Sequence, residues 1–420
     1  MFNQRKTDIV VLGAGAVGLT AAHALTNRQM DYVLLDQGKP KDSHSYALAL
    51  HPETLEIFDS LGLAEAILRK VHPVQKVSIY EDDHEKAMLD YSMLPLKYPF
   101  LAVISQSELE QILIESLASK SHKPLWNHRV RFMEDGGDVL KVSVDRLTEG
   151  MTGYAVAHFE KEIDKTFDYS VNYLIGADGH ESTARRIAGI EFDEVDQAAD
   201  YAIFEFSTNV ELPDEMRIII QGDKTHAYWP LSNGRCRWSF QIETGSVPER
   251  LLTKNYHHTQ LGGYKNSLLD QGRLEDFLSS NAPWFYGSVE NLTWRALTRF
   301  ECRLVNAFGN GRIWLAGDAA HTTPQASILS MNVGIREAVD LVDRLDSAGT
   351  DLERQKALEQ YDRHYRDEWQ YLLDLDHHIS AADKAAHWLL SHRSSLVGNI
   401  PATGETLTTL LAQMHLFDAA

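Results

Sequence analysis

The sequence is poor in cysteine, which limits the kinds of site and compartment that it indicates. Only two cysteines, Cys236 and Cys302, occur in 420 residues, and they lie far apart. Such a pair forms neither a disulfide framework nor a zinc-ligand pattern. The adjacent histidines at 257–258 and 377–378 point apart on a strand or a helix. We therefore expect no metal site and a reducing, cytoplasmic setting.

Positive charge is also scarce. The chain has 40 Lys and Arg against 60 Asp and Glu, a formal net charge of −20 at pH 7. Nucleic acids and anionic membrane surfaces both attract basic proteins, so this balance argues against both as general partners.

Long apolar runs are missing, and none approaches the about 20 residues needed to span a bilayer. The first residues, MFNQRKTD, lead directly to a strand pattern and leave no room for the apolar region of a signal peptide. Internal repeats and low-complexity linkers are missing as well. With 44% hydrophobic and 24% charged residues, a chain of this length is expected to fold as two or three globular domains.

Glycine follows a clear pattern near the N-terminus, in DIVVLGAGAVGLTAAHALTNRQMDYVLLD. Apolar runs and helical spacing predict a buried strand, a helix and a second strand, at 9–12, 16–27 and 32–35. Between the first strand and the helix, Gly13, Gly15 and Gly18 form G-x-G-x-x-G. Gly13 permits a tight turn, Gly15 lets the backbone approach a diphosphate, and Gly18 allows close packing of helix and strand.

The helix N-terminus and an acidic residue complete this first motif. Ala16 and Val17 open the helix, whose amides and partial positive charge attract phosphates. Asp36 ends the second strand, where a carboxylate can accept hydrogen bonds from an adenosine ribose. The sequence thus predicts a dinucleotide site, which the motif alone does not assign to FAD or to NAD.

A second strand-turn-helix pattern lies at 173–190, YLIGADGHESTARRIAGI. An apolar strand ends at Gly176, Asp178 and Gly179 make a turn, and a helix opens near Ser182. Taken alone, this joint leaves open that Asp178 is only a turn residue and Ser182 only a helix cap.

A third pattern lies at 311–321, GRIWLAGDAAH, where a strand ends in a turn at Gly317 and Asp318. With the first two motifs, and with ISQSELEQIL at 104–113, it makes the chain resemble the para-hydroxybenzoate hydroxylase family, the single-component FAD-dependent aromatic hydroxylases. The resemblance covers most of residues 5–345. It implies an α/β fold: a Rossmann-like FAD-binding domain with an inserted antiparallel-sheet substrate domain and C-terminal helices.

The resemblance also implies roles for individual residues. Asp178 would lie near the diphosphate and the path of NADPH, and Arg185 would support that turn. Asp318, after Gly317, would hydrogen-bond the ribityl chain of FAD. The implied neighbours of the flavin ring are Gln106, Pro324 and Asn332. Asn332 would start the helix whose N-terminus stabilises the anionic edge of reduced flavin.

His321 follows the Gly-Asp turn and invites a role as general base. We favour a histidine that holds the loop by hydrogen bonds, and no residue is assigned as a catalytic acid or base.

Two departures from the family pattern fall near the cofactor. The family has a glycine-rich run between Pro324 and Asn332, where this chain has Ser-Ile-Leu-Ser at 327–330. Ile328 is the hardest change, because β-branched residues disfavour positive φ. At Tyr46 the family has an arginine, and tyrosine brings no charge. We expect a different loop path or fewer amide contacts with the flavin. Flavin mobility and NADPH use are therefore left open, and the FAD site is expected to remain.

Between about 196 and 300 the pattern changes to strands. RCRWSFQI, 235–242, alternates strictly between apolar and polar residues, and Asn233-Gly234 predicts a hairpin with 228–231. Further strands, at 201–208, 216–222 and 74–82, would complete an antiparallel sheet of four or more strands. The aromatic residues Phe204, Trp229 and Trp238 have two interpretations: they cover an aromatic substrate over the flavin, or they form the core of the sheet.

We expect three regions in the chain. A discontinuous FAD-binding domain comprises 1–72, 101–195 and 301–350, and a substrate domain comprises 73–100 and 196–300. The helical C-terminal region, 351–420, is broken at 398–406 and has a last helix near 407–416. A homodimer through these helices is left open, and no thioredoxin-like domain is expected.

The resemblance implies a FAD-dependent monooxygenase that hydroxylates an aromatic or polycyclic small molecule with O2, through a flavin C4a-hydroperoxide. NADH and NADPH are both open as its reductant. One alternative is a FAD-dependent halogenase or alkene reductase of the same fold, although the halogenase pattern Trp-x-Trp-x-Ile-Pro is missing. The other alternative is a non-catalytic homologue that binds flavin or another ligand.

Overall fold

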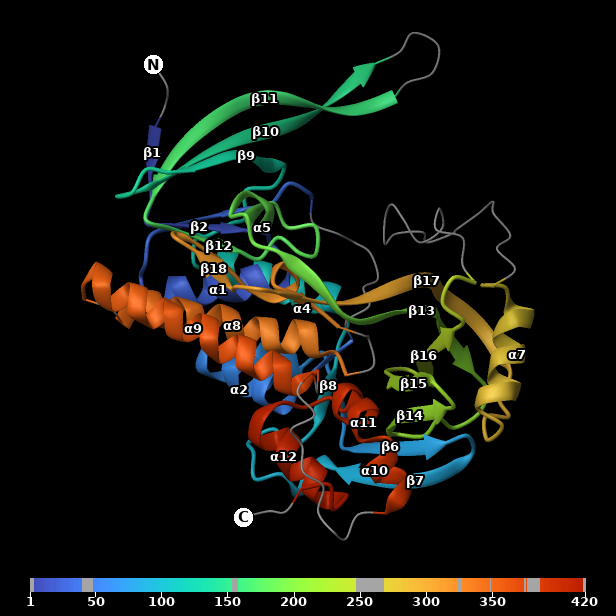
Figure 1. Cartoon of the computed structure of the whole chain (residues 1–420). Helices are drawn as coiled ribbons and strands as arrows, with labels where there is room; N and C mark the ends of the chain where they lie inside the picture. Colours follow the sequence, from blue (N-terminus) through green and yellow to red (C-terminus); the bar gives the residue numbers. More distant parts are fainter. Residues whose placement is uncertain are drawn as a thin grey trace.

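The computed structural model describes residues 4–39, 48–152, 158–246, 268–323, 327–347, 349–373, 375 and 386–417. Figure 1 shows a layered α/β body and, beside it, a large twisted sheet with helix α7 (Gln271–Asn281) on its outer face.

A short sheet lies at the centre of the α/β body. Its strands are β2 (Ile9–Leu12), β3 (Tyr32–Leu35), β12 (Tyr173–Gly176), β18 (Gly309–Asn310) and β19 (Ile313–Leu315). Their order in the sheet is β18-β19-β12-β2-β3, and all neighbours are parallel except the edge pair β18–β19. All four residues of β2 are buried, as expected for a strand that is covered on both faces.

Long helices cover one face of this sheet (Figure 1). They are α1 (Ala16–Asn27), α4 (Gln106–Ser119), α8 (Leu329–Ser347) and α9 (Asp351–Leu372). Helix α1 packs against α4 and α8, and α9 packs on α8. A capping box opens α9, because Thr350 and Glu353 each accept a hydrogen bond from the other's backbone amide. The bounds of β2, α1 and β3 match the sequence prediction.

A four-stranded sheet covers the opposite face, and the motifs did not predict it. It consists of β1 (Gln4–Lys6), β9 (His128–Asp135), β10 (Leu140–Thr152) and β11 (His158–Val171), in the order β1-β11-β10-β9. Val142, Val144, Phe167 and Tyr169 bury this sheet's inner face in the main core. The distal part of the β10–β11 hairpin extends away from the body (Figure 1).

A third sheet has three short strands. It contains β4 (Ala49–Leu50), β5 (His72–Val74) and β8 (Leu101–Val103), in the order β4-β8-β5. Two short helices, α2 (Pro52–Ser60) and α3 (Ala64–Leu68), lie between β4 and β5 in the chain.

The large sheet has eight strands in the order β20-β17-β13-β16-β15-β14-β6-β7. The pair β6–β14 is parallel and every other pair is antiparallel. The strands are β6 (Lys76–Glu81), β7 (His84–Asp90), β13 (Phe192–Thr208), β14 (Met216–Gln221), β15 (Lys224–Leu231), β16 (Arg235–Ile242), β17 (Val289–Val305) and β20 (His321–Thr322).

The predicted hairpin at Asn233-Gly234 is confirmed. Both residues have positive φ, 64° and 65°, and Leu231 pairs with Arg235 across the turn. Asparagine and glycine are the residues that adopt such angles most readily, so the turn fixes the register of β15 on β16.

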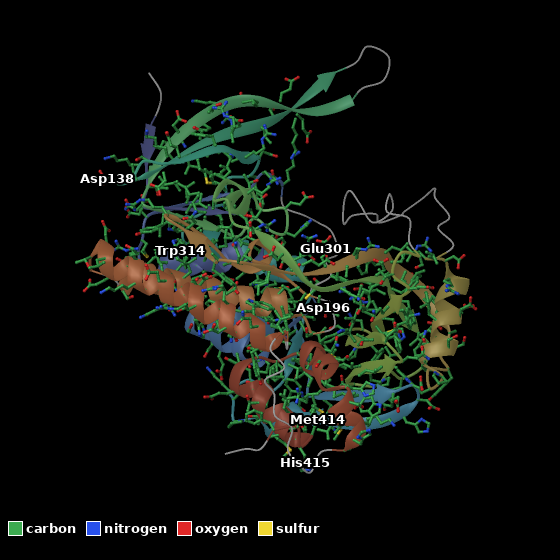
Figure 2. All side chains as sticks on the ribbon, viewed as in Figure 1. Asp138, Asp196, Glu301, Trp314, Met414 and His415 are labelled. Carbon is green, nitrogen blue, oxygen red and sulfur yellow. The ribbon has the colours of Figure 1, made fainter. Side chains whose placement is uncertain are left out.

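Short helices close the chain against the large sheet and the α/β body. They are α10 (His387–Ser391), α11 (Arg393–Asn399) and α12 (Gly404–Gln413). Tyr91 donates a hydrogen bond to the Pro401 carbonyl at 2.9 Å, and Gln413 bonds both the amide and the carbonyl of Asp90. Figure 2 labels Met414 and His415 at the end of this segment.

Strands β13 and β17 connect the two bodies and are each 17 residues long. Asp196 on β13 and Glu301 on β17 lie where these strands leave the α/β body (Figure 2). The two strands cross the boundaries expected near 196 and 300, and the domain limits themselves stay predictions.

Among the helices of the described ranges, none combines the length and the apolar character that a membrane span requires.

Candidate cofactor site

Three turns begin at one edge of the central sheet. Leu12, Gly176 and Leu315 are the last residues of β2, β12 and β19, and they are direct partners in the sheet register. Each is followed by one of the three motifs. The carboxyl edge of a parallel sheet is where open α/β folds bind their ligands. The fold therefore brings together motifs that lie about 300 residues apart in the sequence.

The first turn tolerates no side chain at two of its glycines. Gly13 has φ +102°, and a Cβ there would lie 2.6 Å from the carbonyl carbon of Ala177. A Cβ on Gly18 would overlap the carbonyl oxygen of Gly13. The first turn is thus packed directly on the second, and α1 is packed on the first turn.

Gly15 differs, because few described atoms lie close to it. In the part of the chain that the structure describes, and apart from its chain neighbours, a Cβ on Gly15 would meet one atom within 4 Å, a carboxylate oxygen of Glu110 at 3.5 Å. Gly15 is also the N-cap of α1 and provides no side-chain cap. Ala16 and Val17 are the first residues of α1, so the backbone amides of this loop lie at the N-terminus of the helix.

Two carboxylates bind the amides of this loop. Asp36, directly after β3, accepts a hydrogen bond from the Ala14 amide at 2.8 Å and another from Gly38 at 2.7 Å. Glu110, on α4, accepts from the Ala16 amide at 3.2 Å. Gln106, the first residue of α4, donates to the same Glu110 oxygen at 2.7 Å. Motif reasoning identified Asp36 and Gln106 but missed Glu110, although its i, i+4 spacing from Gln106 is visible in the sequence.

In the second turn, Asp178 caps the short helix α5 (Thr183–Ile187). Its carboxylate accepts from the Thr183 amide at 2.6 Å, the Ala184 amide at 3.2 Å and the Ser182 hydroxyl at 2.5 Å. Burial raises the pKa of Asp178, and these hydrogen bonds act against that shift. Asp178 and Ser182 therefore have the structural roles that the sequence left open.

Arg185 joins the second turn to the third. Its guanidinium donates to the Ala319 carbonyl at 2.8 Å and to the His180 carbonyl at 2.7 Å. It also lies 3.9 Å from the ring centre of Phe192. This geometry agrees with the supporting role that the resemblance implies for Arg185.

The third turn, η2 (Gly317–Ala319), packs against the first motif. Gly317 has φ +65°, and a Cβ there would lie 2.8 Å from Val17. Gly334 of α8 approaches equally closely, because its Cβ would lie 2.7 Å from the Gly317 Cα. Asp318 is exposed although protein surrounds it, and desolvation raises the pKa of its carboxyl group. A solvent-accessible carboxylate in such a position can accept hydrogen bonds from the hydroxyl groups of a bound dinucleotide.

The fully buried carboxylate of Glu337 holds the third turn in place through hydrogen bonds. Glu337 of α8 accepts from the Gly317 amide at 2.8 Å, from His321 Nε2 at 2.9 Å and from the Trp369 indole at 3.0 Å. His321 therefore holds the loop, which is the interpretation that the sequence favoured. Sequence reasoning missed Glu337, because only the fold places α8 beneath the turn.

In the loop before α8, Ile328 adopts a positive φ angle, which glycine adopts more readily. This residue has φ +52° and is buried. His51 donates from Nε2 to the Ser327 carbonyl at 2.9 Å, which anchors the loop to α2. Pro324, Tyr46 and the histidines at 257–258 and 377–378 lie outside the described residues.

Asn332 lies inside α8, which begins earlier than the sequence predicted, at Leu329. Its amide group donates to the Ala49 and Ile328 carbonyls and accepts from the His51 amide at 2.8 Å. The early start arises because Leu329 and Met331 are buried and extend the helix by one turn. The helix N-terminus is thus at Leu329, and Asn332 positions the loop.

The aromatic residues of the large sheet point in two directions. Phe204 and Trp238 are fully buried under α7, where Phe240 stacks on Phe277 at 5.0 Å and on Trp238 at 5.1 Å. This packing agrees with the core interpretation for Phe204 and Trp238. Trp229 lies on the opposite face and packs with the core of the α/β body.

The same opposite face contains a buried ion pair. Arg237 of β16 donates from Nε to Glu205 of β13 at 2.7 Å, and their side chains are 1% and 4% exposed. The guanidinium lies 5.0 Å from the ring centre of Trp294. In the described part of the chain, no cluster of three or more His, Cys, Asp or Glu could hold a metal ion.

The sequence matches a known family and several curated proteins. The family model described as FAD binding domain matches residues 6–375. The chain is 27% identical over 358 residues to 6-methylpretetramide 4-monooxygenase of Streptomyces rimosus, covering 84% of this chain and 58% of that protein. It is 25% identical over 343 residues to pentachlorophenol 4-monooxygenase of Sphingobium chlorophenolicum, covering 79% and 57%. The chain thus spans less than two thirds of these curated relatives.

Solved structures confirm the fold. The p-nitrophenol 4-monooxygenase of Pseudomonas putida superposes with a TM-score of 0.73 and 17% identity, covering 99% of both chains. Aklavinone-11 hydroxylase, in a ternary complex with FAD and aklavinone, has a TM-score of 0.63 and 19% identity, covering 88% of this chain and 67% of that one. The predicted α/β fold and the resemblance to para-hydroxybenzoate hydroxylases are confirmed, and the chain belongs to the FAD binding domain family.

Proposed function

We propose that the chain carries the activity of a FAD-dependent, NAD(P)H-using monooxygenase that hydroxylates an aromatic or polycyclic small molecule with O2. The names of its relatives support this activity, and they act on phenolic and polycyclic compounds according to those names. The observation that carries the proposal is the register of Leu12, Gly176 and Leu315, which sets three cofactor motifs at one sheet edge.

The residues at this edge fit FAD along its length. Asp36 would bind the adenosine ribose, and the backbone from Gly15 to Val17, where Glu110 bonds the Ala16 amide, would bind the diphosphate. Asp318 would bind the ribityl chain, and the N-terminus of α8 would face the pyrimidine edge of the flavin. When bound, FAD supplies the electron transfer and the oxygen chemistry of the reaction.

The chain's own task is to place the cofactor and to keep the reaction site dry. Arg185 and Glu337 hold the second and third turns in fixed positions, so the flavin would meet a preorganised surface. Near the path proposed for NADPH, the Asp178 carboxylate is already used as the cap of α5, so its role there would be to shape the turn. No side chain is proposed as a general base.

We place the substrate on the face of the large sheet opposite α7. Trp229 lies on that face, whereas Phe204 and Trp238 lie beneath α7 and are not retained as substrate contacts. This face adjoins the α/β body, as a substrate that reacts at the flavin requires.

Anaerobic stopped-flow reduction of the purified flavoprotein tests the proposal. NADPH or NADH is mixed with the protein alone and with a panel of phenols and polycyclic aromatics. We expect at least one aromatic compound to speed flavin reduction and to yield, in air, a product heavier by one oxygen atom. A product that gains a halogen or two hydrogens identifies one of the alternative reactions. If no ligand speeds reduction and no product forms, the chain is a non-catalytic homologue and the proposal is wrong.

A cytoplasmic location and a homodimer also stay proposals. The two thiols, Cys236 and Cys302, are free and buried, which is consistent with a reducing compartment. Light scattering of the purified chain would measure its oligomeric state.

A further inference from the structure

One carboxylate occupies the place where the cofactor's diphosphate should bind. Glu110 reaches from α4 to the first amide of α1, at Ala16, with a hydrogen bond of 3.2 Å. The N-cap residue Gly15 has no side chain that could accept from this amide. Glu110 therefore supplies the cap that the glycine motif lacks.

Two neighbouring contacts hold the Glu110 carboxylate in this position. Gln106 lies one turn earlier on α4 and donates to the same oxygen at 2.7 Å. Helix α4 itself packs against α1, and this packing fixes the position of the Glu110 backbone relative to the loop. Among the described residues other than the chain neighbours of Gly15, only this Glu110 oxygen lies within 4 Å of a Cβ built on Gly15.

The negative charge of Glu110 lies at the helix N-terminus where the diphosphate of FAD is proposed to bind. The N-terminus of α1 attracts a diphosphate for the same reason that it attracts Glu110: unpaired amides and the positive end of the helix dipole. Two anionic groups within a few ångströms of each other repel, and the repulsion is strong where protein replaces water. Binding of the diphosphate must therefore work against the Glu110 charge or displace it from the amide.

We propose that Glu110 limits the affinity of the cofactor's diphosphate, by capping α1 with a negative charge at the diphosphate subsite. The proposal rests on the proposed FAD site. It assigns Glu110 a function opposite to that of a usual cofactor contact, because its removal strengthens binding. Gln106 is then a positioning residue that directs the Glu110 carboxylate toward the loop.

The test compares Glu110→Gln with the wild type. Glutamine can still accept from the Ala16 amide, so the cap remains and only the charge is lost. The matched control is Glu115→Gln, which makes the same charge change at an exposed position of α4. The dissociation constant of FAD is measured from the flavin fluorescence released when each holoenzyme is diluted. ADP and adenosine are measured by competition with FAD.

We expect Glu110→Gln to bind both FAD and ADP more tightly, by on the order of tenfold, because one nearby charge is removed. Adenosine, which lacks the diphosphate, should bind as it does to the wild type, and Glu115→Gln should leave all three affinities unchanged. Loss of folding cannot produce tighter binding, so a gain separates this role from a structural one.

Equal or weaker FAD binding by Glu110→Gln, or an equal gain with Glu115→Gln, overturns the proposal. If Glu110→Gln does not fold, Glu110→Ala decides by the same criterion. The wild-type measurement separates the two proposals: a wild type that shows no saturable FAD binding refutes the FAD site itself, whereas a wild type that binds and an unchanged variant refute only the role of Glu110.

Discussion

The carboxylate of Glu337, inside α8, accepts a hydrogen bond from the backbone amide of Gly317 at 2.8 Å. Both residues are buried, and the same carboxylate also binds the side chains of His321 and Trp369. One side chain thus ties the turn that carries Asp318 to two helices. Since this turn is expected to hold the ribityl chain of FAD, the placement of the cofactor would depend on Glu337 even if Glu337 did not touch it.

Replacing Glu337 should weaken both the fold and the site. Glu337→Ala leaves the Gly317 amide and the Trp369 indole without an acceptor, and an unsatisfied buried donor costs roughly 1–3 kcal/mol. We expect about 3 kcal/mol less stability and weaker FAD binding. Glu337→Gln keeps one acceptor oxygen and should lose less. Urea unfolding and FAD titration measure the two effects, and an alanine variant as stable as wild type contradicts the role of Glu337.

The strain at Ile328 predicts an inverted preference between alanine and glycine. At most sites glycine is less stable than alanine, by roughly 0.5–1 kcal/mol. At φ +52° the order should reverse, because a left-handed angle costs a residue with a Cβ roughly 1–2 kcal/mol. Both variants lose the three buried isoleucine carbons beyond Cβ, and only alanine keeps the Cβ that meets the strain. We expect Ile328→Gly to be more stable than Ile328→Ala by about 1 kcal/mol in urea unfolding, and the opposite order would show that the loop does not adopt this angle in solution.

Buried histidines should make the fold sensitive to acid. Burial lowers the pKa of His51 to about 4, from an ordinary value of 6.5, and it has the same effect on His23 and His226. Between pH 6.5 and 4, these histidines are therefore protonated in the unfolded chain but neutral in the folded chain. The stabilising contribution of each neutral histidine is complete above pH 6.5 and is lost as the pH falls toward 4, by up to roughly 3 kcal/mol per group.

His51→Gln tests this linkage, since glutamine can still donate to the Ser327 carbonyl but does not titrate. The variant should show a weaker fall of unfolding free energy between pH 6.5 and 4 than the wild type. His84→Gln, at an exposed position, is the control and should leave the slope unchanged. Equal slopes in all three proteins would exclude a neutral, buried His51.

The ion pair between Arg237 and Glu205 should be costly to break from one side only. Glu205→Ala leaves a buried guanidinium without its carboxylate, which destabilises proteins by roughly 3–5 kcal/mol. The double variant Glu205→Leu, Arg237→Met removes both charges and should recover much of that loss. Chemical unfolding of the single and double variants provides the comparison. Similar stability of the wild type and Glu205→Ala would mean that the pair contributes little.

Local patterns predicted what local physics determines. The strand, helix and strand from Ile9 to Leu35 follow from apolar runs around three glycines, and their bounds match the structure. The turn at Asn233 and Gly234 follows from the residues that accept positive φ. The alternation in β16 correctly placed Cys236, Trp238 and Phe240 on one face.

The remainder depends on contacts between distant segments. Alternation could not tell which face of the sheet α7 covers, so Trp238 was open to two interpretations. Glu110 and Ala16 are separated by 94 positions, and only the packing of α4 on α1 brings them together. At Ile328 the residue type disfavours positive φ, yet the surrounding packing imposes it, with His51 holding the preceding residue.

The most direct test of the account is an equilibrium titration of the full chain, freed of flavin, with FAD. We predict saturable quenching of the flavin fluorescence at one FAD per chain, and a marked loss of affinity in Asp318→Ala, whose carboxylate is expected to bind the ribityl chain. A chain that is colourless when purified under mild conditions, and that shows no saturable change with added FAD, would contradict the claim that the three turns form one flavin site.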